Sequence, residues 1–344
     1  MKGAQSETAP KYTLLRERDT HRYYSYIIRA KPTPAVTQYT TSTMSNDLIT
    51  ITHTKSGAKA SIHPFGATLT SVTTGSGDEL LFVSKDAKLD GTKAIRGGIP
   101  LCFPQFGQPD KSMPQHGFLR NNYWTEVAGS KTDDDASASV SMELALKDVV
   151  NARGGKWDVG TTKLDAKCTY TVKIDGNGFT TTIDMENTGT EAWDFMVLLH
   201  TYFAVGSGAA LDGATCNVVG LAGYTVTDKV TGDEYLLGED PVTIPGSLVD
   251  RVHTPPEGTL DLDVTIAVGP NKKLSLTASG EVDGTKVPVS GVVWNPNKEG
   301  AKALGDFGDE QYVDMICVEP GLLSNVPLLE GGKAATFSQF VKVL

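Results

Sequence analysis

The chain has 344 residues, a formal net charge of −10 and a hydrophobic fraction of 39%. No apolar run approaches the ~18 residues that a membrane-spanning helix needs, so we expect no membrane segment. The acidic excess argues against a general nucleic-acid binder, which usually presents a basic face. It does not exclude a small anionic substrate.

The first 43 residues differ in charge from the rest of the chain. They hold seven Lys or Arg and three Asp or Glu, a net charge of +4, so the remainder carries −14. We expect residues 1–43 to be a poorly ordered extension, with Met44 as an alternative start. A basic organelle-targeting segment is a second interpretation. Nothing in it resembles a secretory signal, so we expect a cytoplasmic protein.

The four cysteines are far apart in the sequence. They are separated by 66, 48 and 101 positions, without a CxxC motif (Cys102, Cys168, Cys216 and Cys317). Because each lies in an apolar or strand-like run, we predict buried free thiols and no cysteine metal cluster. Free thiols fit a reducing compartment.

From residue 44 onward the pattern is that of β-structure. In chain order, the predicted strands are Thr68–Thr73, Leu80–Val83, Ser137–Leu146, Lys163–Asp175, Phe179–Met185, Trp193–His200, Leu274–Ser279, Val287–Trp294 and Val313–Glu319. The clearest of them alternate strictly between apolar and polar residues, which is typical of a strand with one buried face. Long helical periodicity is missing. The sequence therefore predicts a mainly β fold, a single large antiparallel β-sandwich over residues 44–344.

One turn supports this interpretation directly. Asp175-Gly176-Asn177-Gly178 separates two alternating runs. Asp-Gly and Asn-Gly readily supply the positive φ angles that tight two-residue turns require. We therefore predict a β-hairpin here.

Two segments rich in Gly and Pro interrupt the strand pattern. Arg96–Gly107 reads Arg-Gly-Gly-Ile-Pro-Leu-Cys-Phe-Pro-Gln-Phe-Gly, a composition that disfavours a regular ladder. Pro114–Asn121 offers an amide, an imidazole and a guanidinium within six positions, from Gln115, His116 and Arg120. Shaped loops on a rigid sheet commonly hold sites, and Gly117 would leave room for a ligand. Taken alone, the second segment is more simply a polar turn with a solvated Arg120.

Two further residues lie on apolar runs far apart in sequence. His200 ends the run that begins at Asp194, and Glu319 follows Met315–Val318. A lone His there is most often a core residue, whereas a carboxylate is rarely buried without a partner. We expect Pro320 to end the strand, which would place Glu319 at a sheet margin where a cleft can form. Partial burial would raise the pKa of Glu319, and a Glu and a His in one cleft would form a base/acid couple.

These segments together resemble the hexose-6-phosphate mutarotases, the glucose-6-phosphate 1-epimerase branch of the aldose 1-epimerase family. Five motifs occur in order, from about residue 50 to the C-terminus: Arg96–Gly107, Pro114–Asn121, Leu199–Phe203, Val293–Pro296 and Ile316–Gly321. Residues 1–43 are not covered. The resemblance implies a β-sandwich of the galactose-mutarotase type and an isomerase activity.

The resemblance also implies roles for individual residues. The catalytic pair of the family matches His200 and Glu319, and its substrate-contacting residues match Arg96, Gln115 and Arg120. A contacting Asp matches Asp250, although Asp228, Asp233 and Asp240 lie nearby. His116 occupies the position of a sugar-binding His. Asn297 departs from the pattern, because related sequences have an aromatic residue there, which leaves a packing detail open.

The implied reaction interconverts the α and β anomers of D-glucose 6-phosphate and other hexose 6-phosphates. Glu319 would take the proton of the C1 hydroxyl, and His200, kept protonated by the nearby carboxylate, would protonate the ring oxygen. His116 is an alternative proton donor. Arg96 and Arg120 would bind the phosphate. No cofactor or metal is expected, and we expect a monomer.

Two other functions stay open at this point. A mutarotase that acts on unphosphorylated aldoses would use the same fold and the same His/Glu couple. A noncatalytic carbohydrate-binding sandwich would not need that couple.

Overall fold

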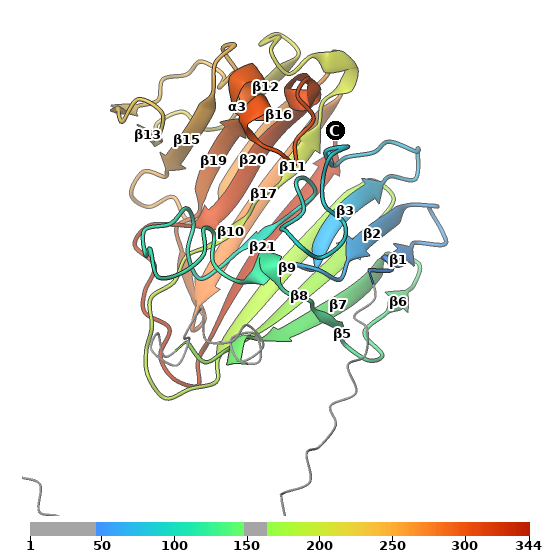
Figure 1. Ribbon diagram of the computed structural model, residues 1–344, viewed down its shortest axis with the longest axis vertical. Coiled ribbons are helices and arrows are strands. Elements are labelled where there is room, and N and C mark those ends of the chain that lie inside the picture. The colour runs from blue at the N-terminus through green and yellow to red at the C-terminus, as the bar shows by residue number, and fades with distance from the viewer. Residues whose placement is uncertain (1–45, 148–163) are drawn as a thin grey trace, which may run out of the picture. The chain divides into compact units, whose positions relative to one another are not determined.

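The computed structural model describes residues 46–147 and 164–344. The expected extension at residues 1–43, with both of its interpretations, lies outside the described residues. Strands dominate the described part, and they form three antiparallel sheets of three, eight and ten strands (Figure 1). No helix in these ranges is both long enough and apolar enough to cross a membrane.

The ten-stranded sheet is the most regular of the three. Its strand order is β12 (Cys216–Val219), β16 (Leu262–Val268), β17 (Lys273–Val282), β21 (Ala334–Val343), β9 (Gly178–Asn187), β8 (Ala166–Ile174), β7 (Ala138–Ala145) and β5 (Thr125–Glu126). Two short strands pair beside this path, β18 (Thr285–Val287) with β17 and β6 (Thr132–Asp133) with β7. Period-two burial along β8 explains the regularity, because every second side chain from Ala166 to Ile174 is buried.

The eight-stranded sheet contains the more broken strands. Its order is β14 (Glu234–Leu236), β13 (Thr225–Asp228), β15 (Val249–Thr254), β19 (Ser290–Asn295), β20 (Met315–Leu322), β10 (Val197–Leu199) and β4 (Leu101–Cys102), and β11 (Tyr202–Ala204) pairs with β20. Among the described residues, the helices are short: α3 (Asn297–Ala303) and the 3-10 turns η1 (Leu119–Asn121), η2 (Gly206–Gly208) and η3 (Gln311–Asp314). The third sheet is formed by β1 (Ile49–Thr52), β2 (Lys59–His63) and β3 (Thr68–Thr73).

One large hydrophobic core joins the sheets. It includes fully buried Leu276 and Phe337 of the ten-stranded sheet together with Val293 and Val318 of the eight-stranded sheet. Fully burying an apolar side chain of this size contributes ~1.5–3 kcal/mol, so this shared core is the main stabilising feature. One polar contact crosses it, where the Gln339 side-chain amide donates to Thr201 Oγ1 at 3.0 Å, with both residues buried.

Several strand predictions need correction at their ends. Leu80–Val83 makes only isolated bridges, through Leu81 and Val83, and forms no named strand. The Trp193–His200 run contributes only the short β10, and Val313 belongs to η3 rather than to a strand. The Val287–Trp294 run is split between β18 and β19 around Pro288, which has no N–H for a ladder.

The predicted hairpin is confirmed, but its turn works differently from the expectation. β8 and β9 pair from Ala166–Asn187 to Ile174–Phe179. Gly176, Asn177 and Gly178 do not have positive φ angles. Instead, the Asp175 carboxylate accepts the N–H groups of Asn177 and Gly178 at 2.7 and 3.0 Å. Gly178 is required because a Cβ there would overlap the main chain of Val341.

The four cysteines are all free and buried, as the sequence predicts.

Candidate active site

Alternate residues of the eight-stranded sheet face away from the shared core. On β10 and β11, Val197, Leu199 and Phe203 belong to the core, whereas Leu198 and Tyr202 pack in two smaller clusters outside it. His200 lies between Leu198 and Tyr202 in this period-two sequence, and Glu319 follows Cys317 in the same way on β20. The two residues therefore share the sheet face that lies outside the core.

Pro320 does not end β20, contrary to the sequence prediction. It pairs with Gly291 of β19, and the strand continues to Leu322. On the other side of β20 the partner changes, because β10 pairs at Gly321–Leu322 and β11 pairs at Met315–Cys317. Proline is tolerated at this interruption, where no ladder partner requires its N–H. Glu319 thus lies inside the sheet, and His200 and Thr201 fill the gap opposite it.

A cavity of about 240 Å³ opens on this face. It brings together all seven candidate residues from the sequence: Arg96, Gln115, His116, Arg120, His200, Asp250 and Glu319. The other lining residues are Phe106, Gly107, Lys229, Val292, Trp294 and Leu304. The predicted roles of the seven residues remain predictions, but segments more than 200 positions apart converge on one space.

His200 and Glu319 lie side by side on the cavity wall. His200 Nδ1 is 3.3 Å from Glu319 Oε1, and the side chains are 8% and 1% exposed. The pair is not aligned for a hydrogen bond, and neither His200 Nδ1 nor Glu319 Oε2 has another hydrogen-bond partner among the described residues. The imidazole is stacked on the Tyr202 ring, with centroids 4.8 Å apart and planes 11° apart, which fixes its orientation.

Burial drives the two groups toward their uncharged forms. It raises the pKa of Glu319 well above its usual range, and the nearby Asp250 carboxylate raises it further. Burial lowers the pKa of His200 well below its usual range, and the charges of Arg120 and Arg96 lower it further. The expectation that the carboxylate keeps His200 protonated is therefore wrong for this arrangement. The favoured couple is a carboxylic acid beside a neutral imidazole.

A third titratable group approaches the couple. One donor atom from each of His200, Cys317 and Glu319 lies within 4.8 Å of the others. The wide spacing of the cysteines in the sequence did not predict this cluster of potential metal donors. Burial raises the pKa of the Cys317 thiol well above its usual range, so the thiol is neutral and adds no charge to the couple.

Two hydrogen bonds to other side chains hold Arg96 in place. Its Nε donates to Asp306 Oδ1 at 3.2 Å, and its Nη1 donates to the Tyr202 hydroxyl at 3.3 Å. Lys93 Nζ is 2.8 Å from the other oxygen of the buried Asp306. Burial alone would raise the pKa of Asp306, but the two cations outweigh it and keep this carboxyl charged. Asp306 thus fixes the guanidinium that reaches the cavity.

Arg120 is carried by η1 and, like Arg96, is half-buried. Its Nη2 donates to the main-chain oxygen of Gln115 at 3.1 Å. Its buried Nε has no hydrogen-bond partner among the described residues. A guanidinium that lines the cavity and has an unused donor is suited to bind an anion that enters it. Arg120 is therefore only partly solvated, in contrast to the simpler interpretation of this segment as a turn with a solvated Arg120.

His116 is buried beside this guanidinium. The Gly107 N–H donates to His116 Nδ1 at 3.2 Å, so the ring proton is on Nε2. Burial and the Arg120 charge lower the pKa of His116 far below its usual range, which keeps the ring neutral. A ring in this fixed tautomer can donate one hydrogen bond from Nε2. The space beside Gly117 is filled by the Phe103 main chain, so the expected room for a ligand there is absent.

The structure separates Asp250 from the neighbouring aspartates. Asp250 lines the cavity, and burial raises its pKa. Asp228 instead accepts the Arg251 Nε–H at 2.9 Å and two main-chain N–H groups of its own turn. Neither Asp233 nor Asp240 lines the cavity. Asp250 is therefore the aspartate placed to contact a ligand.

Besides the apolar Val292 and Leu304, three lining side chains were not singled out from the sequence. Phe106 and Trp294 lie within quoted motifs but carry no titratable group. Lys229 follows β13 in an ordinary polar turn, Asp228-Lys229-Val230, where an exposed lysine is unremarkable. Only the pairing of β13 with β15, which carries Asp250, shows that Lys229 faces the same cavity.

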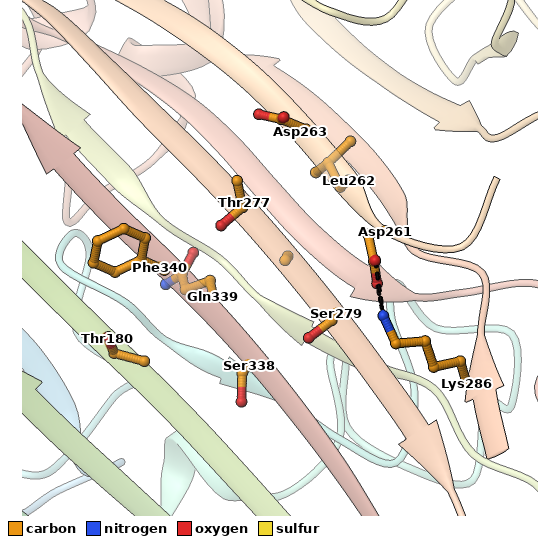
Figure 2. Close-up of a pocket in the computed structure, with 11 residues that line it drawn as sticks. Thr180, Asp261, Leu262, Asp263, Thr277, Ser279, Lys286, Ser338, Gln339 and Phe340 are labelled. Atoms are coloured by element: carbon orange, nitrogen blue, oxygen red, sulfur yellow. Dashed lines mark hydrogen bonds and ion pairs between the residues drawn. The ribbon is translucent and has the colours of Figure 1, made fainter. Parts of the chain in front are cut away.

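A second hollow lies on the outer face of the ten-stranded sheet (Figure 2). Figure 2 shows Thr277, Ser279, Ser338 and Phe340 along its floor, with Lys286 and Asp261 at one end. Lys286 Nζ donates to both Asp261 oxygens, at 3.1 and 2.9 Å. Asp263 also lines this hollow, and none of the lining residues has a buried side-chain N or O atom without a hydrogen-bond partner, in contrast to the His200–Glu319 cavity.

Comparisons with known proteins agree with this geometry. Residues 47–337 match the family described as Aldose 1-epimerase. A protein of Cenchrus ciliaris named "Putative glucose-6-phosphate 1-epimerase" is 30% identical over 279 residues, 80% of this chain and 78% of that protein. A protein of Escherichia coli K12 with the same name is 30% identical over 304 residues, 86% and 90% of the two chains.

A solved structure is also similar. The crystal structure of a Salmonella typhimurium protein titled "putative mutarotase" has a TM-score of 0.68 at 27% identity, and the match covers 86% of this chain and 90% of that chain. The predicted fold, a large antiparallel β-sandwich of the galactose-mutarotase type, is thereby confirmed. From the family match and these similarities, we conclude that the chain belongs to the aldose 1-epimerase family.

Proposed function

We propose that the protein interconverts the α and β anomers of D-glucose 6-phosphate, and of other hexose 6-phosphates. The observation that carries this proposal is the buried His200–Glu319 couple, 3.3 Å apart, in a cavity that is also lined by Arg96 and Arg120. The couple supplies proton transfer, and the guanidinium groups supply recognition of an anion.

Ring opening requires one proton to leave the sugar and another to enter it. With Glu319 as carboxylate and His200 as imidazolium, Glu319 accepts the proton of the C1 hydroxyl. His200 donates its proton to the ring oxygen, the C1–O5 bond breaks, and the C1 aldehyde forms. The couple leaves this step as carboxylic acid and neutral imidazole, which is the form that burial favours.

Ring closure uses the couple in reverse. After rotation about the C1–C2 bond, the neutral His200 accepts the proton of the C5 hydroxyl as that oxygen attacks the other face of C1. Glu319 returns its proton to the former aldehyde oxygen, and the charged couple is restored. The two states differ only in the position of one proton. Each positioned proton transfer typically contributes ~10²–10⁴ in rate.

Arg96 and Arg120 are proposed to bind the 6-phosphate. A guanidinium binds phosphate at short range through paired N–H donors, while the distant acidic charge of the protein is screened over ~8–10 Å. Replacement of both arginines is expected to raise KM strongly for glucose 6-phosphate. Gln115, Asp250 and the Nε2–H of His116 are placed to contact sugar hydroxyls.

Two-dimensional exchange NMR tests the proposal directly. The rate of α/β interconversion is measured with glucose 6-phosphate, mannose 6-phosphate, galactose 6-phosphate and free glucose. We expect the protein to catalyse exchange of the phosphorylated sugars with a higher kcat/KM than that for free glucose.

The same assay separates the alternatives. Equal kcat/KM for glucose and its phosphate would favour an epimerase of unphosphorylated aldoses. Exchange at the spontaneous rate with every sugar would leave a noncatalytic carbohydrate-binding role.

A further inference from the structure

Lys229 is a third cation at the cavity, and it differs from the two arginines in exposure. It directly follows β13, and its main-chain N–H donates to the Asp250 main-chain oxygen at 2.8 Å, which fixes its position at the cavity. Its side chain is exposed, in contrast to the enclosed guanidinium groups of Arg96 and Arg120. Its Nζ lies 4.4 Å from the centroid of the Phe106 ring.

The ammonium group of Lys229 forms no ion pair with an acidic side chain of the described residues. Among the ion pairs of the described residues, Arg96 is bound to Asp306 and Arg251 to Asp228, but Lys229 takes part in none. Its ammonium group contacts the face of the Phe106 ring, and such exposed cation–π contacts contribute only ~0.5–1 kcal/mol. The amine can therefore leave the ring for a stronger, charge-assisted hydrogen bond with little loss.

The charge of Lys229 acts inside the cavity. It opposes the rise in the pKa of Glu319 that burial causes, and it adds to the lowering of the pKa of His116 and His200. The amine lies beside Gly107, because a Cβ at that position would be in van der Waals contact with Nζ at 3.7 Å. Lys229 thus projects a positive charge over a space that is bounded by Phe106 and Gly107.

We propose that Lys229 is a specificity-determining residue that binds the phosphate group of the substrate. The inference rests on the proposed function and adds a residue that neither the motifs nor the family resemblance assigns. C1 must reach His200 and Glu319, which are almost fully buried, so the C6 end of the sugar points toward the exposed side of the cavity. An exposed, flexible ammonium with three donors can follow a phosphate there and complete its binding by Arg96 and Arg120, which hydrogen bonds to the protein hold in place.

The alternative role for Lys229 is purely electrostatic. A positive charge near Glu319 favours the carboxylate form of the catalytic couple, whatever the substrate. That role predicts an equal fall in kcat/KM for phosphorylated and free sugars when Lys229 is replaced. Phosphate binding predicts a larger fall in kcat/KM for the phosphorylated sugar than for the free sugar.

The test compares Lys229→Met and Lys229→Arg with the wild type, with glucose 6-phosphate and glucose as the two substrates of the exchange assay. We expect Lys229→Met to lower kcat/KM for glucose 6-phosphate ~10- to 100-fold, mainly through KM, since a charged hydrogen bond is worth that factor. The fall in kcat/KM for glucose should be much smaller, because only the charge near the couple changes for that sugar, and Lys229→Arg should retain most activity. Lys111→Met, which replaces an exposed lysine of the neighbouring loop outside the cavity lining, is the matched control.

Inorganic phosphate gives a second measurement that does not depend on turnover of the phosphorylated sugar. As an inhibitor of glucose exchange, it should bind Lys229→Met ~10-fold more weakly than the wild type and should bind the Lys111 variant normally. A wild-type preference for glucose 6-phosphate that Lys229→Met fully retains would overturn this inference alone. An equal loss for both sugars would also overturn it. A wild type with no preference for the phosphate would overturn the proposed function together with it.

Discussion

The two large sheets share a core but differ in the regularity of their pairing. In the ten-stranded sheet, β9 and β21 pair without interruption, and Thr182 and Ser338 of these strands share a side-chain hydrogen bond of 2.8 Å on the outer face. In the eight-stranded sheet, β20 exchanges β10 for β11, and His200 and Glu319 retain buried polar atoms without hydrogen-bond partners among the described residues. The chemistry lies where pairing is interrupted, and the regular sheet provides the rigid support.

The largest effect should come from the interrupted sheet. Glu319→Gln keeps the shape of the side chain but removes the proton acceptor, so anomerisation should fall ~10²–10⁴-fold, toward the spontaneous rate. Exchange NMR at saturating glucose 6-phosphate measures it. His200→Asn should cause a loss of similar size, and retained activity in the Glu319 variant would refute its assignment as the base.

A core substitution in the regular sheet should instead reduce stability. Leu276 of β17 is fully buried, and Leu276→Ala should lower the free energy of unfolding by ~2–5 kcal/mol through lost burial and a cavity. Urea denaturation measures this loss. The folded fraction should keep its kcat/KM, and a large fall in kcat/KM under native conditions would contradict the separation of the two sheets.

Glu319→Gln should also make the protein more stable at neutral pH. The folded-state pKa of Glu319 is raised, so unfolding at pH above 4.5 lets the freed carboxyl ionise. This group therefore disfavours the folded state increasingly as pH rises from about 4.5 toward its folded pKa. The amide removes that effect, and we expect a gain on the order of 1 kcal/mol at pH 7 that disappears below pH 4. A lower melting temperature for the variant at pH 7 would contradict the raised pKa.

The plot of kcat against pH should show no inflection near pH 6.5, where a histidine with an ordinary pKa titrates. The active couple holds one exchangeable proton between two residues. The couple binds a second proton only below the lowered pKa of His200. It loses its single proton only above the raised pKa of Glu319. The plateau should therefore extend through pH 6.5 without a break. The measurement uses kcat at saturation, because the second ionisation of a phosphate ester near pH ~6 affects binding.

The smallest effect is expected in the outer hollow of the ten-stranded sheet. Lys286→Met breaks an exposed ion pair with Asp261, and exposed pairs contribute little to stability. The melting temperature and the exchange rates should both stay within experimental error. A clear loss of activity in this variant would show that the outer hollow takes part in the function.

The sequence predicted the fold well where one face of a strand is exposed to solvent. β7, β8 and β9 alternate cleanly because their outer faces meet solvent, and their predicted ranges differ from the observed strands by a few residues. β20 is buried on both faces, so its composition shows no alternation and could not reveal that the strand continues through Pro320. That continuation depends on β19 and on the change from β10 to β11, which are non-local.

The candidate site was predicted from motifs, but its electrostatics were not. His200 is near a carboxylate, which suggests an imidazolium, yet Arg120 and Arg96 approach it from distant segments and favour the neutral ring. Lys229 was missed for a related reason. A lysine in a polar turn has no local signature, and only the sheet places it beside Asp250.

The loop that carries Arg96 has a consequence for any redesign of this protein. Its main chain replaces a neighbouring strand, because the His200 N–H donates to the Pro100 oxygen at 3.1 Å and the Tyr202 N–H to the Gly98 oxygen at 2.9 Å. A side chain at Gly98 would collide with the main chain of Leu69, so the loop has little freedom to move. Remodelling this loop for a new sugar would also displace the imidazole of His200, the proposed proton donor. Substrate range is better altered at the turn that carries Lys229, which can vary while the proton-transfer machinery stays in place.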